Sequence, residues 1–175
     1  INDAPLIADV EDMSILEDNS TSITFEVLDV DTGEVLILHV LSDTNAVSSI
    51  INDEDHSVIL TPDTNWYGLA NIVAIVDDGE LTDTITFSID VENVSDQPYS
   101  VLGEDIFCMQ GQNVRIDGSG SYDIDNESLT YFWTVPGIFD DTLSSDSSFL
   151  SILAPDLDVA STFLVSLGVE NENGL

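Results

Sequence analysis

Basic residues are almost missing from this chain. A single arginine, Arg115, and no lysine stand against 35 aspartates and glutamates, which gives a net charge of −34 over 175 residues. Nucleic acids are excluded as partners, because a protein that binds them needs cationic groups to replace the phosphate counterions. Binding to an anionic membrane surface is disfavoured for the same reason. So negative a surface repels itself, and we expect it to need screening salt or divalent cations.

Cysteine, histidine and long apolar runs are also scarce. Cys108 is the only cysteine, so no disulfide forms within the chain, and we interpret it as a small buried side chain. No apolar run reaches the ~20 residues of a membrane-spanning helix, and we expect no membrane insertion. The two histidines, His39 and His56, favour neither a zinc site nor a catalytic triad. We expect no enzymatic activity.

Apolar residues, in contrast, make up 43% of the chain and recur at every second position. In Thr84–Val91 and in Thr162–Val169 every odd-numbered residue is apolar. A period of two is typical of strands with one face on a core and the other in water. Short strands separated by turns such as Asp78-Gly79 are typical of β-sandwiches. We predict an all-β chain of two tandem Ig-like, Greek-key β-sandwiches.

The polar segment Val94–Pro98 is the best candidate for a domain boundary. It follows a clear strand pattern and ends in proline, which cannot donate to a sheet. It also echoes the opening segment Asn2–Pro5, and a linker repeated at domain-length spacing indicates a modular array. We predict a first domain over residues 1–98 and a second over 99–175. The second ends just after the turn-like segment Glu170–Gly174, so we predict a truncated last strand and an open sheet edge.

Six short motifs of the first domain occur in a fixed order. They are Asn2-Asp3-Ala4-Pro5, Glu17-Asp18-Asn19, Asp29-Val30-Asp31-Thr32-Gly33, Leu60-Thr61-Pro62-Asp63-Thr64-Asn65-Trp66-Tyr67-Gly68, Val76-Asp77-Asp78-Gly79 and Asn93-Val94-Ser95-Asp96-Gln97-Pro98. Together they resemble the cadherin-like repeats of large bacterial surface proteins. The resemblance spans about residues 1–98.

The second domain resembles a PKD domain, a seven-stranded sandwich of cell-surface proteins and secreted hydrolases. The residues that carry the likeness are Gly120-Ser121-Tyr122-Asp123-Ile124-Asp125, Tyr131-Phe132-Trp133, Ala154-Pro155 and Val165-Ser166-Leu167-Gly168-Val169. Asn171 stands where many PKD domains have aspartate.

The resemblance to cadherins implies calcium (Ca2+) between successive repeats, bound by six to eight oxygen ligands. One implied ligand set faces a preceding repeat and comprises Asp3, Asp29, Asp31 and Asp77, with Asn2 joining through its amide oxygen. The other lies at the internal junction and comprises Glu17, Asn93, Asp96, Asp123 and Asp125. Because Ser95 and Gln97 replace the usual linker asparagines, we expect at most one or two ions there.

The acids have a second interpretation as solvated turn formers that bind no metal, since Asp and Asn favour turns. Two carboxylates about 4 Å apart repel by roughly 1 kcal/mol in water and by more near a protein surface. With almost no basic residues to offset this repulsion, we favour calcium.

We interpret the chain as a calcium-binding structural or adhesion module of a large bacterial surface or secreted protein, with calcium rigidifying the inter-domain junction. Extracellular modules bind calcium at roughly 10⁻⁴–10⁻³ M, which places the chain outside the cell or on its surface. The expected partners are neighbouring repeats of the same chain and a cell-surface protein or polysaccharide.

Two alternatives remain open. One is a carbohydrate-binding accessory module of a secreted polysaccharide-degrading enzyme. Trp66, in a turn, is the better candidate for stacking on a sugar, because Tyr131 and Trp133 follow a strand pattern that places them in the core. The other alternative is homophilic adhesion.

Overall fold

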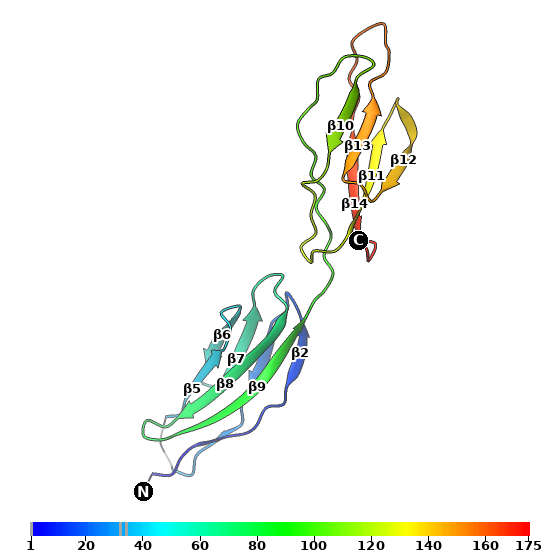
Figure 1. The fold of residues 1–175 in the computed structure, drawn as a ribbon. Coiled ribbons are helices and arrows are strands. Elements are labelled where there is room, and N and C mark those ends of the chain that lie inside the picture. Colours follow the sequence, from blue (N-terminus) through cyan, green and yellow to red (C-terminus); the bar gives the residue numbers. More distant parts are fainter. Residues whose placement is uncertain (1, 32, 34) are drawn as a thin grey trace. The chain divides into compact units, whose positions relative to one another are not determined.

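The chain forms two compact all-β units (Figure 1). The structure, a computed structural model, describes residues 2–31, 33 and 35–175, with the side chains of 139–142 and 144 left aside. The described residues form strands and no helix, and therefore none that could cross a membrane. Unit 1 covers Ile1–Val94 and unit 2 covers Ser95–Leu175, whereas the boundary predicted from the sequence follows Pro98. Thr32, which belongs to one of the six motifs, lies outside the described residues.

Unit 1 is a sandwich of two sheets with a short ribbon beside them. The larger sheet has the order β2 (Met13–Leu16), β9 (Thr82–Glu92), β8 (Gly68–Asp77) and β5 (Ile37–Ser42). The smaller has the order β3 (Thr21–Thr24), β7 (Ser57–Pro62) and β6 (Val47–Asn52), and the ribbon pairs β1 (Leu6–Ile7) with β4 (Val27–Leu28). All pairs are antiparallel except β2 with β9, which is parallel.

The core of unit 1 follows the predicted alternation. On β9 the apolar residues are at most 8% exposed, and they comprise Ile85, Phe87, Ile89 and Val91. On β8 the inward residues are fully buried, and they comprise Ala70, Ile72, Ala74 and Val76. Full burial of a large apolar side chain contributes about 1.5–3 kcal/mol. The inward faces of these two strands are therefore a main source of stability for the unit.

Unit 2 has a two-stranded and a three-stranded sheet. The first pairs β10 (Asn113–Asp117) with β13 (Phe149–Leu153), and the second has the order β12 (Phe139–Ser145), β11 (Leu129–Val135) and β14 (Ser166–Asn171). All the pairs are antiparallel. Trp133 is 1% exposed and Tyr131 is buried beside it, so their prediction as core residues is confirmed.

Two predictions for unit 2 need correction. The alternating stretch Thr162–Val169 is a strand only from Ser166 onward, and its inward residues are half-buried. Cys108 was predicted to be buried and is exposed. The reason is that its whole surrounding segment, residues 101–110, lies outside the strands with every residue exposed. Only a paired strand could have turned the side chain of Cys108 toward the core.

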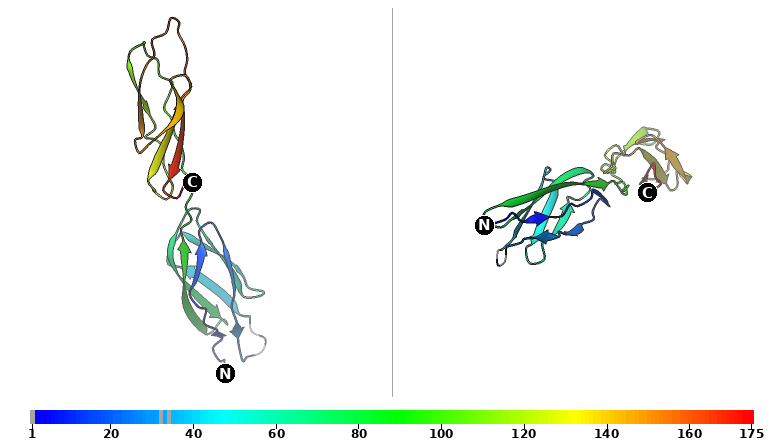
Figure 2. Two further views of the ribbon diagram at one scale, coloured as in Figure 1. Left: turned by 90° about the vertical axis from the view of Figure 1, so that its right-hand side faces the viewer. Right: turned by 90° about the horizontal axis from the view of Figure 1, so that it is seen from below.

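The acidic residues on β8 and β9 avoid the middle of these two strands. The solvent face of β9 carries Thr82, Thr84 and Thr86, and beside them on β8 lie Val73 and Ile75. The acids of β8 and β9 on this face lie near the strand ends, and they comprise Asp77, Asp90 and Glu92. Most of the remaining acids of the unit occupy turns, which gather at the ends of the strands (Figures 1 and 2). These two strands and the turn between them thus carry their negative charge near the tips of the sandwich.

Candidate functional site

The turn between β8 and β9 is built by two aspartates. Asp77 accepts the backbone N–H of Gly79 at 2.7 Å, and Asp78 accepts those of Glu80 and Leu81, also at 2.7 Å. The N–H of Leu81, then that of Glu80 and the amide of Asn2, hold the pKa of Asp78 below its ordinary value of 3.8, against a smaller opposing effect of desolvation. Asp78 is therefore an anion over the whole neutral range.

Two further segments of unit 1 join the acidic residues into a cluster. The side chain of Asn2 donates to Asp78 at 3.0 Å, and the backbone of Asp3 donates to Asp31 at 2.8 Å. Asp31 in turn donates its backbone N–H to Asp29 at 2.8 Å. The structure therefore links the predicted ligands Asp3, Asp29 and Asp31 directly. Asp77 lies one residue from the contact between Asn2 and Asp78.

Two oxygen atoms of this cluster have no hydrogen-bond donor among the described residues. They are Oδ1 of Asn2 and Oδ2 of Asp29, and both are shielded from solvent. Leaving a buried acceptor unsatisfied costs about 1–3 kcal/mol. Oxygen atoms of this kind, next to carboxylates, fit the donor set of a hard cation such as calcium.

The carboxylates of this cluster do not by themselves supply a complete set of metal ligands. Within the part of the chain that the structure describes, no three carboxylate, imidazole or thiol groups converge closely enough to hold a metal ion. An ion at this end of unit 1 would therefore draw on the amide oxygen of Asn2, backbone carbonyls and water besides the acids. Such mixed oxygen ligation is usual for calcium.

Glu17, a predicted ligand of unit 1, is a buried acid. Only 3% of it is exposed, and its carboxylate accepts the backbone N–H of Val94 at 2.5 Å. Its own backbone N–H donates to Glu92 at 2.9 Å. Glu17 therefore fixes the end of β9 and the residues that follow. Asn93, the other predicted ligand here, is exposed.

In unit 2 the three predicted ligands do come together. Asp123 is 6% exposed and accepts the backbone N–H of Asp125 at 2.8 Å. Asp125 accepts the backbone N–H of Asp96, also at 2.8 Å. The predicted grouping of these three with Glu17 and Asn93 stays a prediction.

Asn171, which was not among the predicted ligands, completes this group in unit 2. The buried side chain of Asn171 donates to Asp123 at 3.2 Å, across 48 residues of chain. Neither motif spacing nor strand periodicity relates these two positions. The unusual asparagine in the PKD-like pattern was the one available signal.

The aromatic residues bear on the sugar-binding alternative. Trp66 is half-buried and packs against the core of unit 1, which makes it a poorer sugar-stacking residue than its turn position indicated. Tyr99 and Tyr122 of unit 2 are each about half exposed, and their rings stack with centroids 5.0 Å apart. Two backbone hydrogen bonds join the same residues, so this stack is a cross-strand pair with accessible ring surface.

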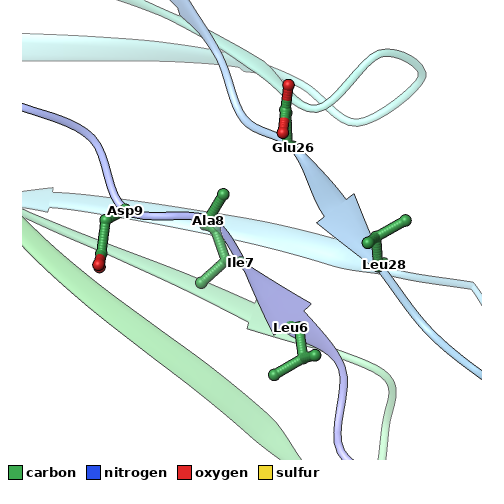
Figure 3. A pocket seen from close by; sticks show the side chains of 6 residues that line it. All are labelled: Leu6, Ile7, Ala8, Asp9, Glu26 and Leu28. Carbon is green, nitrogen blue, oxygen red and sulfur yellow. The ribbon is translucent and has the colours of Figure 1, made fainter.

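A shallow hollow lies along β1 and β4 of unit 1 (Figure 3). It is lined by Leu6, Ile7, Ala8, Asp9, Glu26 and Leu28. Leu6 and Leu28 are largely exposed, whereas Ile7 belongs to the core. The lining brings together no set of polar groups that indicates a particular chemistry.

The fold is that of a β-sandwich module. Residues 1–92 match the family model described as cadherin-like domain, and the chain belongs to this family. No protein with curated annotation matches the chain. The match bears out the cadherin-like part of the sequence interpretation.

Solved structures with a similar fold include other tandem β-sandwiches. The titin domains Z1Z2 in complex with telethonin share 14% identity over 97% of this chain and 96% of theirs, with a TM-score of 0.44. The fibronectin(III)-like modules of Clostridium thermocellum CbhA share 13% over 97% of this chain and 87% of theirs, with a TM-score of 0.38. An endo-fucoidan hydrolase of glycoside hydrolase family 107 shares 18% over 96% of this chain, which spans 28% of the hydrolase, with a TM-score of 0.44. At these scores the likenesses carry no argument about function.

Proposed function

We propose that this chain is a non-enzymatic, extracellular structural or adhesion module that binds calcium at the acidic tip of unit 1. The observation that carries the proposal is a pair of shielded oxygens, Oδ1 of Asn2 and Oδ2 of Asp29, that have no donor among the residues that the structure describes. They lie within the hydrogen-bonded acidic cluster that includes Asp31 and Asp78. A bound cation would satisfy both oxygens and relieve the repulsion among the carboxylates.

Calcium suits this cluster better than a transition metal. All the candidate ligands are oxygens, which hard cations prefer, whereas zinc favours histidine and cysteine. Open, mixed ligation of this kind agrees with the weak affinities of extracellular modules, roughly 10⁻⁴–10⁻³ M. A site of this affinity would be filled outside the cell, where calcium is abundant, and not in the cytosol.

We extend the proposal to unit 2 and to the larger protein of which this chain would be a part. We take unit 2 to be a PKD-type domain, and the burial of Trp133 and Asp123, two residues of its PKD-like motifs, supports this. We place the chain in a large bacterial surface or secreted protein, with neighbouring repeats as its partners. Stiffening of such an array by calcium is a further part of the proposal.

Carbohydrate binding is the second candidate function. The exposed stack of Tyr99 and Tyr122 supports it, since aromatic rings pack against the apolar faces of sugars. The stack is also explained by cross-strand pairing alone. Loss of binding to a neutral polysaccharide in Tyr122→Ala, with the fold retained, would favour this candidate.

A calcium titration followed by NMR tests the main proposal. The backbone amides of residues 29–31 and 77–79 should shift saturably with CaCl₂. Sodium chloride at the same ionic strength should leave them nearly unchanged, because screening alone does not fill a site. Magnesium should shift them less, since it gives up its water shell reluctantly.

Two variants sharpen the titration. Asp29→Asn removes one anionic ligand while keeping an acceptor for the backbone of Asp31, and should weaken calcium binding on the order of tenfold. Asp90→Asn makes the same charge change on the exposed face of β9, and should leave the affinity unchanged. Equal weakening in both variants, or equal responses to calcium and sodium, would show non-specific charge screening and refute the site.

A further inference from the structure

The buried side chain of Asn171 is surrounded by oxygen atoms. Asn171 is the last residue of β14 and is 4% exposed. Its Nδ2 atom lies 2.9 Å from the carbonyl oxygen of Asp96, 3.2 Å from Oδ2 of Asp123 and 3.2 Å from Oγ of Ser95. Oxygens from three separate positions of unit 2 thus converge on a single nitrogen.

The orientation of this amide is fixed by its other end. Oδ1 of Asn171 accepts the backbone N–H groups of Asn173 at 3.2 Å and Leu175 at 3.0 Å. Backbone N–H groups can only donate, so the oxygen of the amide must face them. The NH₂ group must therefore face the three oxygens.

The neighbouring carboxylates also have backbone donors. Oδ1 of Asp123 accepts the N–H of Asp125 at 2.8 Å and that of Glu127 at 3.4 Å. Oδ2 of Asp125 accepts the N–H of Asp96 at 2.8 Å. Hydrogen bonds from uncharged N–H groups to a carboxylate stabilise its charged form. The partial positive charges of these backbone N–H groups thus offset part of the negative charge of the two carboxylates.

We propose that the amide of Asn171 occupies the position of a cation in unit 2, so that the Asp123–Asp125 turn binds no calcium. A calcium ion within about 2.3–2.6 Å of Oδ2 of Asp123 and the carbonyl of Asp96 would crowd the positive end of the amide. The residues present therefore do not fit the metal that the cadherin resemblance implies here. Calcium binding in this chain belongs to unit 1, and unit 2 keeps its fold when calcium is removed.

The same contacts make Asn171 a positioning residue for the start of unit 2. It holds Ser95 and Asp96 against the turn without a metal. Glu127 adds to the arrangement by accepting from Ser95 at 3.0 Å and from the side chain of Asn173 at 2.7 Å. The first residues of the unit are thus anchored by amide and hydroxyl donors.

The test compares the calcium responses of both units in one NMR titration of the full chain. In the wild type, amides of residues 95–96, 123–127 and 171 should respond equally to CaCl₂ and to NaCl of matched ionic strength. Asn171→Asp replaces the NH₂ group by an anionic oxygen of the same shape. We expect this variant to lose stability in EDTA and to recover it with calcium, which then shifts the amides of residues 123–127 saturably.

A matched control variant and two contrary results make this test of the Asn171 inference decisive. Asn113→Asp adds the same charge at an exposed residue of β10 and should not create a calcium-specific response at residues 123–127. Saturable, calcium-specific shifts at Asp123 and Asp125 in the wild type would overturn the inference. So would a folded Asn171→Asp that gains no calcium response. The wild-type result decides the matter even if that variant does not fold. Amides 29–31 report on the proposed function separately in the same spectra.

Discussion

The single arginine of the chain lies over an aromatic ring. The guanidinium carbon of Arg115, on β10, is 3.5 Å from the ring centroid of Phe149, on β13. Such a cation–π contact contributes about 0.5–1 kcal/mol at an exposed site. Arg115 therefore has a packing role within unit 2, besides a small lowering effect on the pKa of Asp117. The hydroxyl and the backbone N–H of Ser119, which donate to Asp117, lower that pKa more.

Gly118 is required by close packing in the core of unit 2. A Cβ atom added there would lie 2.7 Å from Cδ2 of Leu167 and 3.0 Å from the ring of the buried Trp133. We predict that Gly118→Ala destabilises unit 2 by about 1–3 kcal/mol, the usual cost of overpacking. The midpoint of urea unfolding, followed by Trp133 fluorescence, measures the change.

Gly168→Ala is the matched control for this prediction. Its added Cβ would meet only Cβ of Phe132 at 3.8 Å, an ordinary contact, and the residue is exposed on β14. We expect a change within about 0.5 kcal/mol. Similar midpoints for the two variants would show that the space at Gly118 is not needed.

Strands and turns with local sequence signals were predictable, whereas distant side-chain contacts were not. The period of two in Thr84–Val91 identified the inward residues of β9, and Asp78-Gly79 identified the turn before it. Asn171 gave no comparable signal, because its partners depend on how β14 meets the Asp123 turn. The exposure of Cys108 followed from the absence of a paired strand around it, which composition does not reveal.

At the scale of elements, β5 is an edge strand whose outer backbone groups are covered by side chains. Asp53 accepts the N–H of Leu38 at 3.2 Å, and Ser49 donates to the carbonyl of Val40 at 3.5 Å. Open edges invite pairing with other chains, and natural proteins block them in such ways. The side chains of β6 and its following turn therefore protect this edge of the larger sheet.

Removing one of these caps should expose the edge. We predict that Asp53→Ala speeds hydrogen exchange of the Leu38 amide about fivefold, the effect of losing one hydrogen bond of about 1 kcal/mol. Asp55→Ala is the control, because Asp55 lies in the same turn but accepts from Ser57 instead. Equal exchange at Leu38 in both variants would show that Asp53 does not protect the edge.

The pairing of strands was the part of the fold that the sequence left open. Hairpins such as β8 and β9 follow from a short turn between two alternating segments. The parallel pairing of β2 with β9 joins residues 76 positions apart, such as Met13 and Ile89. Nothing local in Met13–Leu16 identifies that partner. Only the resemblance to cadherin-like repeats, and no local pattern, indicated which acidic turns meet at one end of unit 1.

At the scale of the whole molecule, the two units treat their acidic turns differently. In unit 1 the cluster around Asn2 and Asp29 contains two shielded oxygens for which the described part of the chain supplies no donor. In unit 2 the amide of Asn171 donates to Asp123 and to the start of the unit. A chain with a net charge of −34 thus combines the proposed calcium site of unit 1 with a turn of unit 2 that is stabilised by the amide of Asn171. Calcium should act on one unit and leave the other unchanged.

Thermal unfolding with each unit observed separately tests this central claim most directly. Trp66→Phe leaves Trp133 as the reporter of unit 2, and Trp133→Phe leaves Trp66 as the reporter of unit 1. Relative to NaCl of equal ionic strength, CaCl₂ at about 100 times the Kd should stabilise unit 1 by about 2.7 kcal/mol and raise its Tm. The Tm of unit 2 should stay the same. An equal rise in both units, or no rise in unit 1, would contradict the account.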